Sequence, residues 1–189
     1  ENIDRVCFYH LVYSGRGSQM IAEDLTPEES RQAMDTIIRR TRDFEERGLK
    51  KEILTVDNHC DGVYMYLQAL KEDPARAERI KNLIGFNGGN RSGIAFGEVD
   101  PLGNVHPDQF TQHITFGNVR ERKFGDIWTD LSHPTLAGLK DRKGLLKGRC
   151  ASCRHLSMCN GNFRTRAEAV TGDFWESDPA CYLTDEEIN

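Results

Sequence analysis

Four cysteines in the last quarter of the chain are spaced so that they could bind one metal centre. Their pattern is C-x2-C-x5-C-x21-C, running from Cys150 through Cys153 and Cys159 to Cys181. A C-x2-C pair lets two sulfurs reach one centre from a tight turn, and the third sulfur follows in the same loop. The distant fourth cysteine would fasten the C-terminal segment to that loop. We therefore predict that these four cysteines form one metal-binding set.

The spacing leaves several interpretations open. Six cysteines could make three disulfides in an exported protein, but disulfide scaffolds are usually shorter and denser in cysteine. Structural thiols seldom gather in one loop. Zinc ribbons favour two C-x2-C pairs, and only one is present, so an iron–sulfur cluster is favoured over zinc. His155 lies inside the loop and could ligate zinc, although with four cysteines available we expect it to be exposed.

The residues around these cysteines suit an anionic centre. Residues 140–166 hold eight Lys or Arg and one acidic residue, a local charge of +7 in a chain whose net charge is −5. Asn160 and Gly161 follow Cys159 directly, and their backbone N–H groups are expected to point at sulfur. Both features would stabilise a negatively charged cluster.

A second group of candidate residues follows a predicted strand. Asp57, His59 and Cys60 come directly after it, where parallel-sheet proteins place their chemistry, although a structural role is favoured for Cys60. Elsewhere, Cys7 is expected to be a small core residue and His10 to pack within its strand. His106 follows a turn and is expected to be exposed. Neither a nucleotide-binding glycine motif nor a hydrolase nucleophile motif is present.

The predicted elements that would position these groups differ between the two halves of the chain. Residues 5–13 and 51–56 read as strands, and helices are predicted from the Thr26 cap to Gly48, over residues 62–70 and after Pro74. Alternating strands and helices with short connections indicate βα units on a parallel sheet. Two units make an incomplete sheet, so this half is interpreted as part of a larger α/β structure.

After residue 85 the predicted elements become shorter. Strands are expected at 93–99 and 113–116, the latter ending in a Gly117–Asn118 turn, and short helices at 123–128 and 134–140. A glycine- and asparagine-rich linker begins here. We therefore predict two domains, residues 1–85 and 86–189.

The composition of the chain limits the expected cellular location of the protein and the classes of partner that it binds. The chain is 38% hydrophobic and 29% charged, without a long apolar run or an export signal, so a cytoplasmic protein is expected. The acidic balance argues against nucleic-acid or membrane-surface binding. Because the chain opens on Glu1 and enters an apolar run almost at once, we expect it to be a fragment of a longer protein.

Five segments together resemble one enzyme family. They are YHLVYSGRG (9–17), NRSGIAFGEVDPLGNVHPDQF (90–110), TFGNVRERKFGDIW (115–128), KGRCASCRHLSMCNGNFRTRAE (147–168) and DPACYL (178–183). The resemblance is to the C-terminal half of radical SAM enzymes that carry a SPASM or twitch extension, most closely their heme d1 branch. It implies the last two βα units of a partial (β/α)6 TIM-like barrel, followed by a small α+β domain that binds an auxiliary [4Fe-4S] cluster.

The resemblance also implies an activity for the intact protein. This is the radical removal of two propionate side chains from didecarboxysiroheme on the route to heme d1. The family's C-x3-C-x2-C motif, which holds the cluster that cleaves S-adenosylmethionine, is absent here, so this chain alone is expected to be inactive. Cys150, Cys153, Cys159 and Cys181 would hold the auxiliary cluster, for electron relay or as a structural brace. Full ligation by four cysteines favours either role over direct substrate binding.

The implied substrate carries carboxylates, which arginine binds well. Arg16 is our candidate at the first strand tip, with Tyr13 and His59 facing the same end of the barrel. Ordinary loop packing is the competing interpretation for all three, and no catalytic residue is assigned. The expected partners are the tetrapyrrole, the missing N-terminal half of the barrel and an electron donor.

Two groups of alternatives remain. The first is another enzyme with the same extension, either the heme-forming coproheme decarboxylase or a peptide maturase. A maturase would often need more cysteines than the four assigned here. The second is a non-catalytic zinc or iron–sulfur module that binds a partner or passes electrons. The sequence upstream of Glu1 would discriminate, because an enzyme requires the C-x3-C-x2-C motif there.

Overall fold

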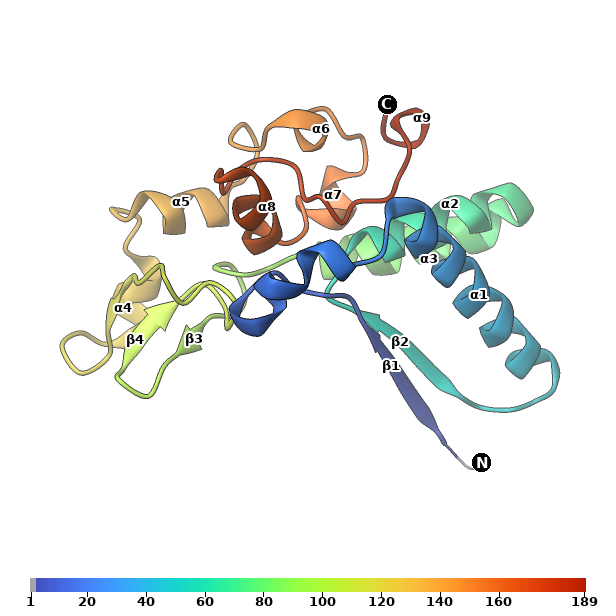
Figure 1. Ribbon diagram of the computed structural model, residues 1–189, viewed down its shortest axis with the longest axis horizontal. Coiled ribbons are helices and arrows are strands. Elements are labelled where there is room, and N and C mark those ends of the chain that lie inside the picture. The colour runs from blue at the N-terminus through green and yellow to red at the C-terminus, as the bar shows by residue number, and fades with distance from the viewer. Residues whose placement is uncertain (1–2) are drawn as a thin grey trace.

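A computed structural model describes residues 3–189 and begins with two strand–helix units (Figure 1). Strands β1 (Arg5–Tyr9) and β2 (Glu52–Val56) are parallel neighbours, with Arg5 opposite Glu52 and Tyr9 opposite Val56. Helix α1 (Pro27–Glu46) connects them, and α2 (Cys60–Glu72) and α3 (Pro74–Asn87) follow. This arrangement confirms a mixed α/β fold with parallel strands.

Helix α1 forms where the sequence predicts it. Thr26 accepts a hydrogen bond from the Glu29 backbone N–H, and the Glu29 carboxylate accepts one from the Thr26 backbone N–H, which completes a capping box. Pro27 occupies the first helical position, where no backbone donor is needed. The helix ends at Glu46, and Gly48 follows with a left-handed φ of 68°.

The first strand is shorter than the predicted 5–13. The ladder ends where the His10 N–H donates to the Val56 carbonyl at 3.0 Å, because β2 stops at Val56 and Asp57 turns away with φ 68°. The chain then enters the 3-10 segment η1 (Gly15–Glu23). The end of β2 therefore sets the end of β1.

After α3 the chain forms a small antiparallel sheet in the order β3 (Glu98–Val99), β4 (Asn104–His106) and β5 (Gly117–Asn118). The predicted strand at 113–116 is wrong, since the strand lies at the two residues that were expected to form a turn. One reason is that the Ile114 carbonyl contacts the His106 ring, at 2.7 Å, instead of a strand neighbour. The predicted helices are confirmed as α4 (Phe124–Thr129) and α5 (Pro134–Lys140).

Four short helices complete the chain: α6 (Gly148–Ala151), α7 (Leu156–Cys159), α8 (Arg164–Thr171) and α9 (Asp185–Ile188). They lie over the ends of β1 and β2, along the upper side of the molecule in Figure 1. One hydrophobic core joins Met34 of α1 and Val63 of α2 to Met158, Tyr182 and Ile188. This core therefore contains residues from both sides of residue 86.

A second core lies around Val105, Phe116, Ile127, Leu136 and Leu139. By contrast, the strand β1 is exposed along its whole length, and Tyr9 is 70% exposed. No helix among residues 3–189 is long and apolar enough to cross a lipid bilayer.

Candidate metal centre

The four predicted ligands line one cavity. Cys150 belongs to α6, Cys153 to the turn after it, Cys159 ends α7, and Cys181 lies in the segment before α9. All four are partly buried and none forms a disulfide. A fifth cysteine, the fully buried Cys60, lines the same cavity.

The chemistry of this donor set fits an iron–sulfur cluster. Such clusters are held by four cysteine thiolates, and four thiols from two separate segments face one cavity here. In the described part of the chain, no three His, Cys, Asp or Glu side chains converge on a single ion.

Arginine side chains supply positive charge beside the sulfurs. Arg149 donates to the backbone carbonyls of Cys181 and Leu183, and Arg164 donates to the backbone carbonyl of Gly161, two residues after Cys159. A hydrogen bond from Cys60 lowers the pKa of the Cys181 thiol to about 7, helped by the Leu183 N–H and by Arg149. Cys181 is therefore poised to act as a thiolate ligand.

The loop around Cys159 is held by contacts that differ from those predicted. The Asn160 N–H donates to the Leu156 carbonyl at 2.7 Å, closing α7, so the expectation that it points at sulfur is wrong. Asn160 itself is left-handed with φ 54°, and its side chain donates to the Asn90 carbonyl. Gly89 packs so closely here that an added Cβ would lie 2.2 Å from the Cys159 carbonyl.

His155 is buried rather than exposed, which corrects the sequence expectation. It is 5% exposed, and its Nε2 lies 2.9 Å from the Glu187 carbonyl. Burial lowers its pKa, which favours the neutral ring. His155 contacts α9, which packs over the cavity from a distant part of the sequence. The spacing of the residues around His155 could therefore not predict its burial.

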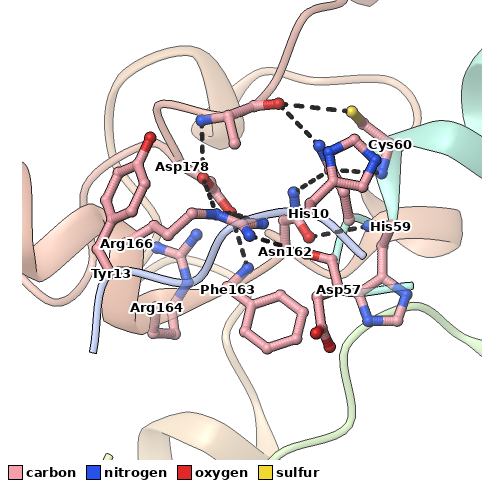
Figure 2. Close-up of polar contacts among 12 residues, drawn as sticks. His10, Tyr13, Asp57, His59, Cys60, Asn162, Phe163, Arg164, Arg166 and Asp178 are labelled. Atoms are coloured by element: carbon pink, nitrogen blue, oxygen red, sulfur yellow. Dashed lines mark hydrogen bonds and ion pairs between the residues drawn. The ribbon is translucent and has the colours of Figure 1, made fainter. Parts of the chain in front are cut away.

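A buried ion pair joins this region to the strand ends (Figure 2). Arg166 donates to both carboxylate oxygens of Asp178, at 2.9–3.1 Å. Its Nη1 also donates to the carbonyls of Leu11 and Asp57, which follow β1 and β2. Asp178 in turn accepts from the backbone N–H of Ala180, the residue before Cys181. One chain of contacts thus runs from both strand tips to the fourth ligand.

The turn between β2 and α2 also contacts the segment before Cys181. The Asn58 amide donates to the Ala180 carbonyl at 3.0 Å, and the Cys60 sulfur lies 3.8 Å from that oxygen. Sequence reasoning missed Asn58, Arg166 and Asp178. The sequence signals for them were indirect: the quoted segments 147–168 and 178–183 contain Arg166 and Asp178, and Asn58 lies in the strand tip at 57–60. Their partners lie far away along the chain, so the spacing could not pair them.

The three candidate substrate residues have different surroundings. Tyr13 is buried and donates to Asp24 at 2.8 Å, and burial together with that carboxylate raises its pKa. His59 stacks on Phe163, and burial lowers its pKa to about 4, so its ring is neutral at pH 7. Figure 2 places Tyr13 and His59 on opposite sides of Arg166. Arg16 is exposed in η1, outside this cluster.

Three further residues differ from their sequence expectations. Cys7 is exposed, because the described chain covers only one face of β1. His106 is buried between the Ile114 carbonyl and Asp100, which corrects its expected exposure. His10 leaves its strand to contact Asp61 of α2 at 2.9 Å. Each position depends on an element distant in sequence.

Comparison with known proteins identifies relatives over the whole chain. The sequence is 60% identical over 191 residues to Fe-coproporphyrin III synthase of Methanosarcina barkeri, which covers 100% of this chain and 48% of that protein. It is 41% identical over 186 residues to pre-heme d1 synthase of Dinoroseobacter shibae, covering 97% of this chain and 46% of the relative. No family model matches the sequence.

A third relative, the AdoMet-dependent heme synthase of Methanosarcina barkeri, is 32% identical over 117 residues, or 62% of this chain and 32% of that protein. The chain belongs to the radical SAM family whose members carry a SPASM or twitch extension. Within that family, these three relatives are named as synthases of hemes or of an iron porphyrin. The chain spans about half the length of the first two.

Proposed function

We propose that the intact protein is a radical SAM enzyme that modifies a tetrapyrrole, and that this chain supplies its auxiliary [4Fe-4S] site. The observation that carries the proposal is the cavity lined by Cys150, Cys153, Cys159 and Cys181, in a chain with 60% identity to a named iron-porphyrin synthase. When bound, such a cluster supplies a one-electron donor or acceptor. The chain itself would contribute four thiolate ligands, flanking arginines, and buried contacts that fix the site to the ends of the strands.

Anaerobic purification of the intact protein with iron and acid-labile sulfide analysis tests the cluster. In a background without the C-x3-C-x2-C cysteines, we expect about four irons and four sulfides per protein. Replacing any one of the four ligands by alanine should lower that content sharply. Cys7→Ala is the matched control and should leave it unchanged. Stoichiometric zinc without sulfide would refute the cluster and favour a zinc module.

Two tetrapyrrole reactions are candidates. Removal of propionates from didecarboxysiroheme, on the heme d1 route, is supported by the pre-heme d1 synthase relative. Formation of iron coproporphyrin III is favoured by the higher identity to that synthase, 60% against 41%. Incubation of the intact enzyme with didecarboxysiroheme, S-adenosylmethionine and a reductant, followed by mass spectrometry, separates the two products.

Arg16, Tyr13 and His59 remain our candidates for substrate binding. Arg16 is exposed near the strand tips, so its guanidinium is available to a carboxylate of the substrate. We expect Arg16→Ala in the intact protein to weaken tetrapyrrole binding about tenfold, the loss of one charge-assisted hydrogen bond. Arg79→Ala, on the exposed side of α3, is the control. Equal affinities would remove Arg16 from the site.

The remaining partners are proposed on the same basis. The N-terminal half of the barrel would cover the exposed strand β1, since the relatives are about twice as long as this chain. An external electron donor would deliver reducing equivalents. A cytoplasmic location is proposed for the assembly, because free thiols and iron–sulfur clusters persist in reducing compartments.

A further inference from the structure

Two arginines beside the cysteine cavity are buried without an acidic partner. Arg142 is 2% exposed and Arg164 is 3% exposed. Among residues 3–189, neither side chain forms an ion pair, whereas the buried Arg166 pairs with Asp178 (Figure 2). The Nε–H group of each also lacks a hydrogen-bond partner within these residues. A buried cation without a counter-charge destabilises a protein, so the two unpaired charges need an explanation.

Both arginines bind the backbone that directly follows the third predicted ligand. The Nη1 atom of Arg142 donates to the carbonyls of Asn160 and Asn162, at 2.9 and 3.3 Å. The Nη2 atom of Arg164 donates to the Gly161 carbonyl between them. Gly161 and Asn162 line the cavity together with the four cysteines. Three consecutive carbonyls therefore point toward the two guanidinium groups, which lie directly behind this part of the cavity wall.

The remaining acceptors of both arginines are neutral. Arg142 Nη2 donates to the Asn90 side-chain oxygen at 2.8 Å and to the Ser92 carbonyl at 3.0 Å, and the other acceptors of Arg164 are also backbone carbonyls. Burial, and then the charge of Arg164, lower the pKa of Arg142 to about 9, although Asp108 opposes this shift at longer range. The surrounding protein thus supplies hydrogen bonds to these cations and no carboxylate in contact with them.

We propose, on the basis of the cluster function above, that Arg142 and Arg164 are positioning residues that hold the loop after Cys159 and supply the buried counter-charge of the anionic cluster. Four thiolates and a [4Fe-4S] core together carry a net negative charge, which two nearby cations offset. The reduced cluster is more negative than the oxidised one. Positive charge behind the cavity wall therefore stabilises the reduced form and raises the reduction potential.

The experiment is a redox titration, followed by electron paramagnetic resonance, of the intact protein. The cysteines of its C-x3-C-x2-C motif are replaced so that only the auxiliary cluster contributes. We expect Arg142→Met to lower the midpoint potential. Arg142→Lys, which keeps the charge and loses the planar fork of donors, should restore most of it. Arg79→Met removes a positive charge at an exposed position of α3, where solvent screens it, and should not shift the potential.

Iron and sulfide content separates the charge from the hydrogen bonds. Retention of the cluster in Arg142→Lys with its loss in Arg142→Met would support the proposal, and equal loss in both would overturn it, because the hydrogen bonds alone would then matter. Arg164→Met is the second charge-removing variant should Arg142→Met not fold. An unchanged potential in a cluster-loaded, charge-removing variant would also overturn the proposal. A parent protein without iron and sulfide would refute the proposed function itself, before any arginine variant is compared.

Discussion

At the scale of single residues, Arg166 is the side chain that contacts both strand tips and the segment before Cys181. It is 0% exposed, and its donors reach Asp178 and the carbonyls of Leu11 and Asp57. A buried cation is tolerated when every donor has a partner, and removing one member of such a pair leaves the other charge uncompensated. Arg166 therefore links the strand tips to the segment that carries Cys181.

Replacing this arginine should destabilise the protein strongly. We expect Arg166→Met to lower the free energy of unfolding by about 3–5 kcal/mol, because Asp178 would stay buried without its partner. Urea unfolding of the intact protein followed by circular dichroism measures the change. Arg79→Met, at an exposed position, should shift the midpoint little. Equal shifts in the two variants would show that the ion pair contributes nothing.

His59 should make the protein sensitive to acid. Burial lowers its pKa from 6.5 to about 4, so the unfolded chain takes up the proton first as pH falls. Stability is unaffected above pH 6.5 and is lost between pH 6.5 and 4, by about 3 kcal/mol in total at one pKa unit per 1.36 kcal/mol.

His59→Phe keeps the stacking on Phe163 and removes the titration. The difference in melting temperature between the parent protein and this variant should therefore change by several degrees across that pH window. A difference that is constant from pH 7 to 4 would contradict the low pKa of His59.

The sequence predicts the local part of this site and misses the rest for a physical reason. The cavity brings Cys150, Cys153 and Cys159 together through short helices and turns, so their spacing alone places them near one another. Cys60 meets Ala180 across 120 positions, and Asn58 meets Asn162 across 104. Such pairs leave no local signal. The same holds for His155, whose burial depends on α9.

At the scale of elements, α1 was predictable because four consecutive residues, Thr26 to Glu29, signal its start. Thr26→Ala removes the capping side chain and should destabilise the protein by about 1 kcal/mol. Thr36→Ala, in the exposed middle of the same helix, is the matched control and should be neutral or slightly stabilising, since alanine favours helices. Thermal unfolding compares them, and a larger loss at Thr36 would contradict the role of the cap.

The junction between α3 and the cysteine loop gives a sharper test. Gly89 has φ 70° and an added Cβ would lie 2.2 Å from the backbone of Cys159, whereas one added at Gly85 meets nothing within 4 Å. We expect Gly89→Ala to reduce iron and sulfide content by displacing Cys159. Gly85→Ala should keep both and gain up to about 1 kcal/mol in stability. Normal cluster content in Gly89→Ala would show that the loop tolerates displacement.

At the scale of the whole molecule, the two-stranded sheet is the part that the described chain leaves incomplete. Phe8 and Tyr9 of β1 are 45% and 70% exposed, although large apolar side chains on a strand normally face a core. A parallel strand that is paired on one side only and carries exposed apolar residues is prone to add another strand. The sequence predicted this incompleteness from the count of βα units, since a parallel sheet needs more than two strands.

Backbone hydrogen exchange of the intact protein tests whether another strand pairs with β1. The His10 N–H donates to Val56 of β2, so by strand alternation the amides of Cys7 and Tyr9 point toward the opposite edge. If the rest of the barrel pairs with this edge, the Cys7 and Tyr9 amides should exchange about as slowly as that of His10, because each has a buried partner. The short segment η1, in which no residue is buried, provides the faster-exchanging reference within the same sample. Rapid exchange at Cys7 and Tyr9 with protection at His10 would mean that β1 is a true edge strand, and that the proposed barrel half packs elsewhere.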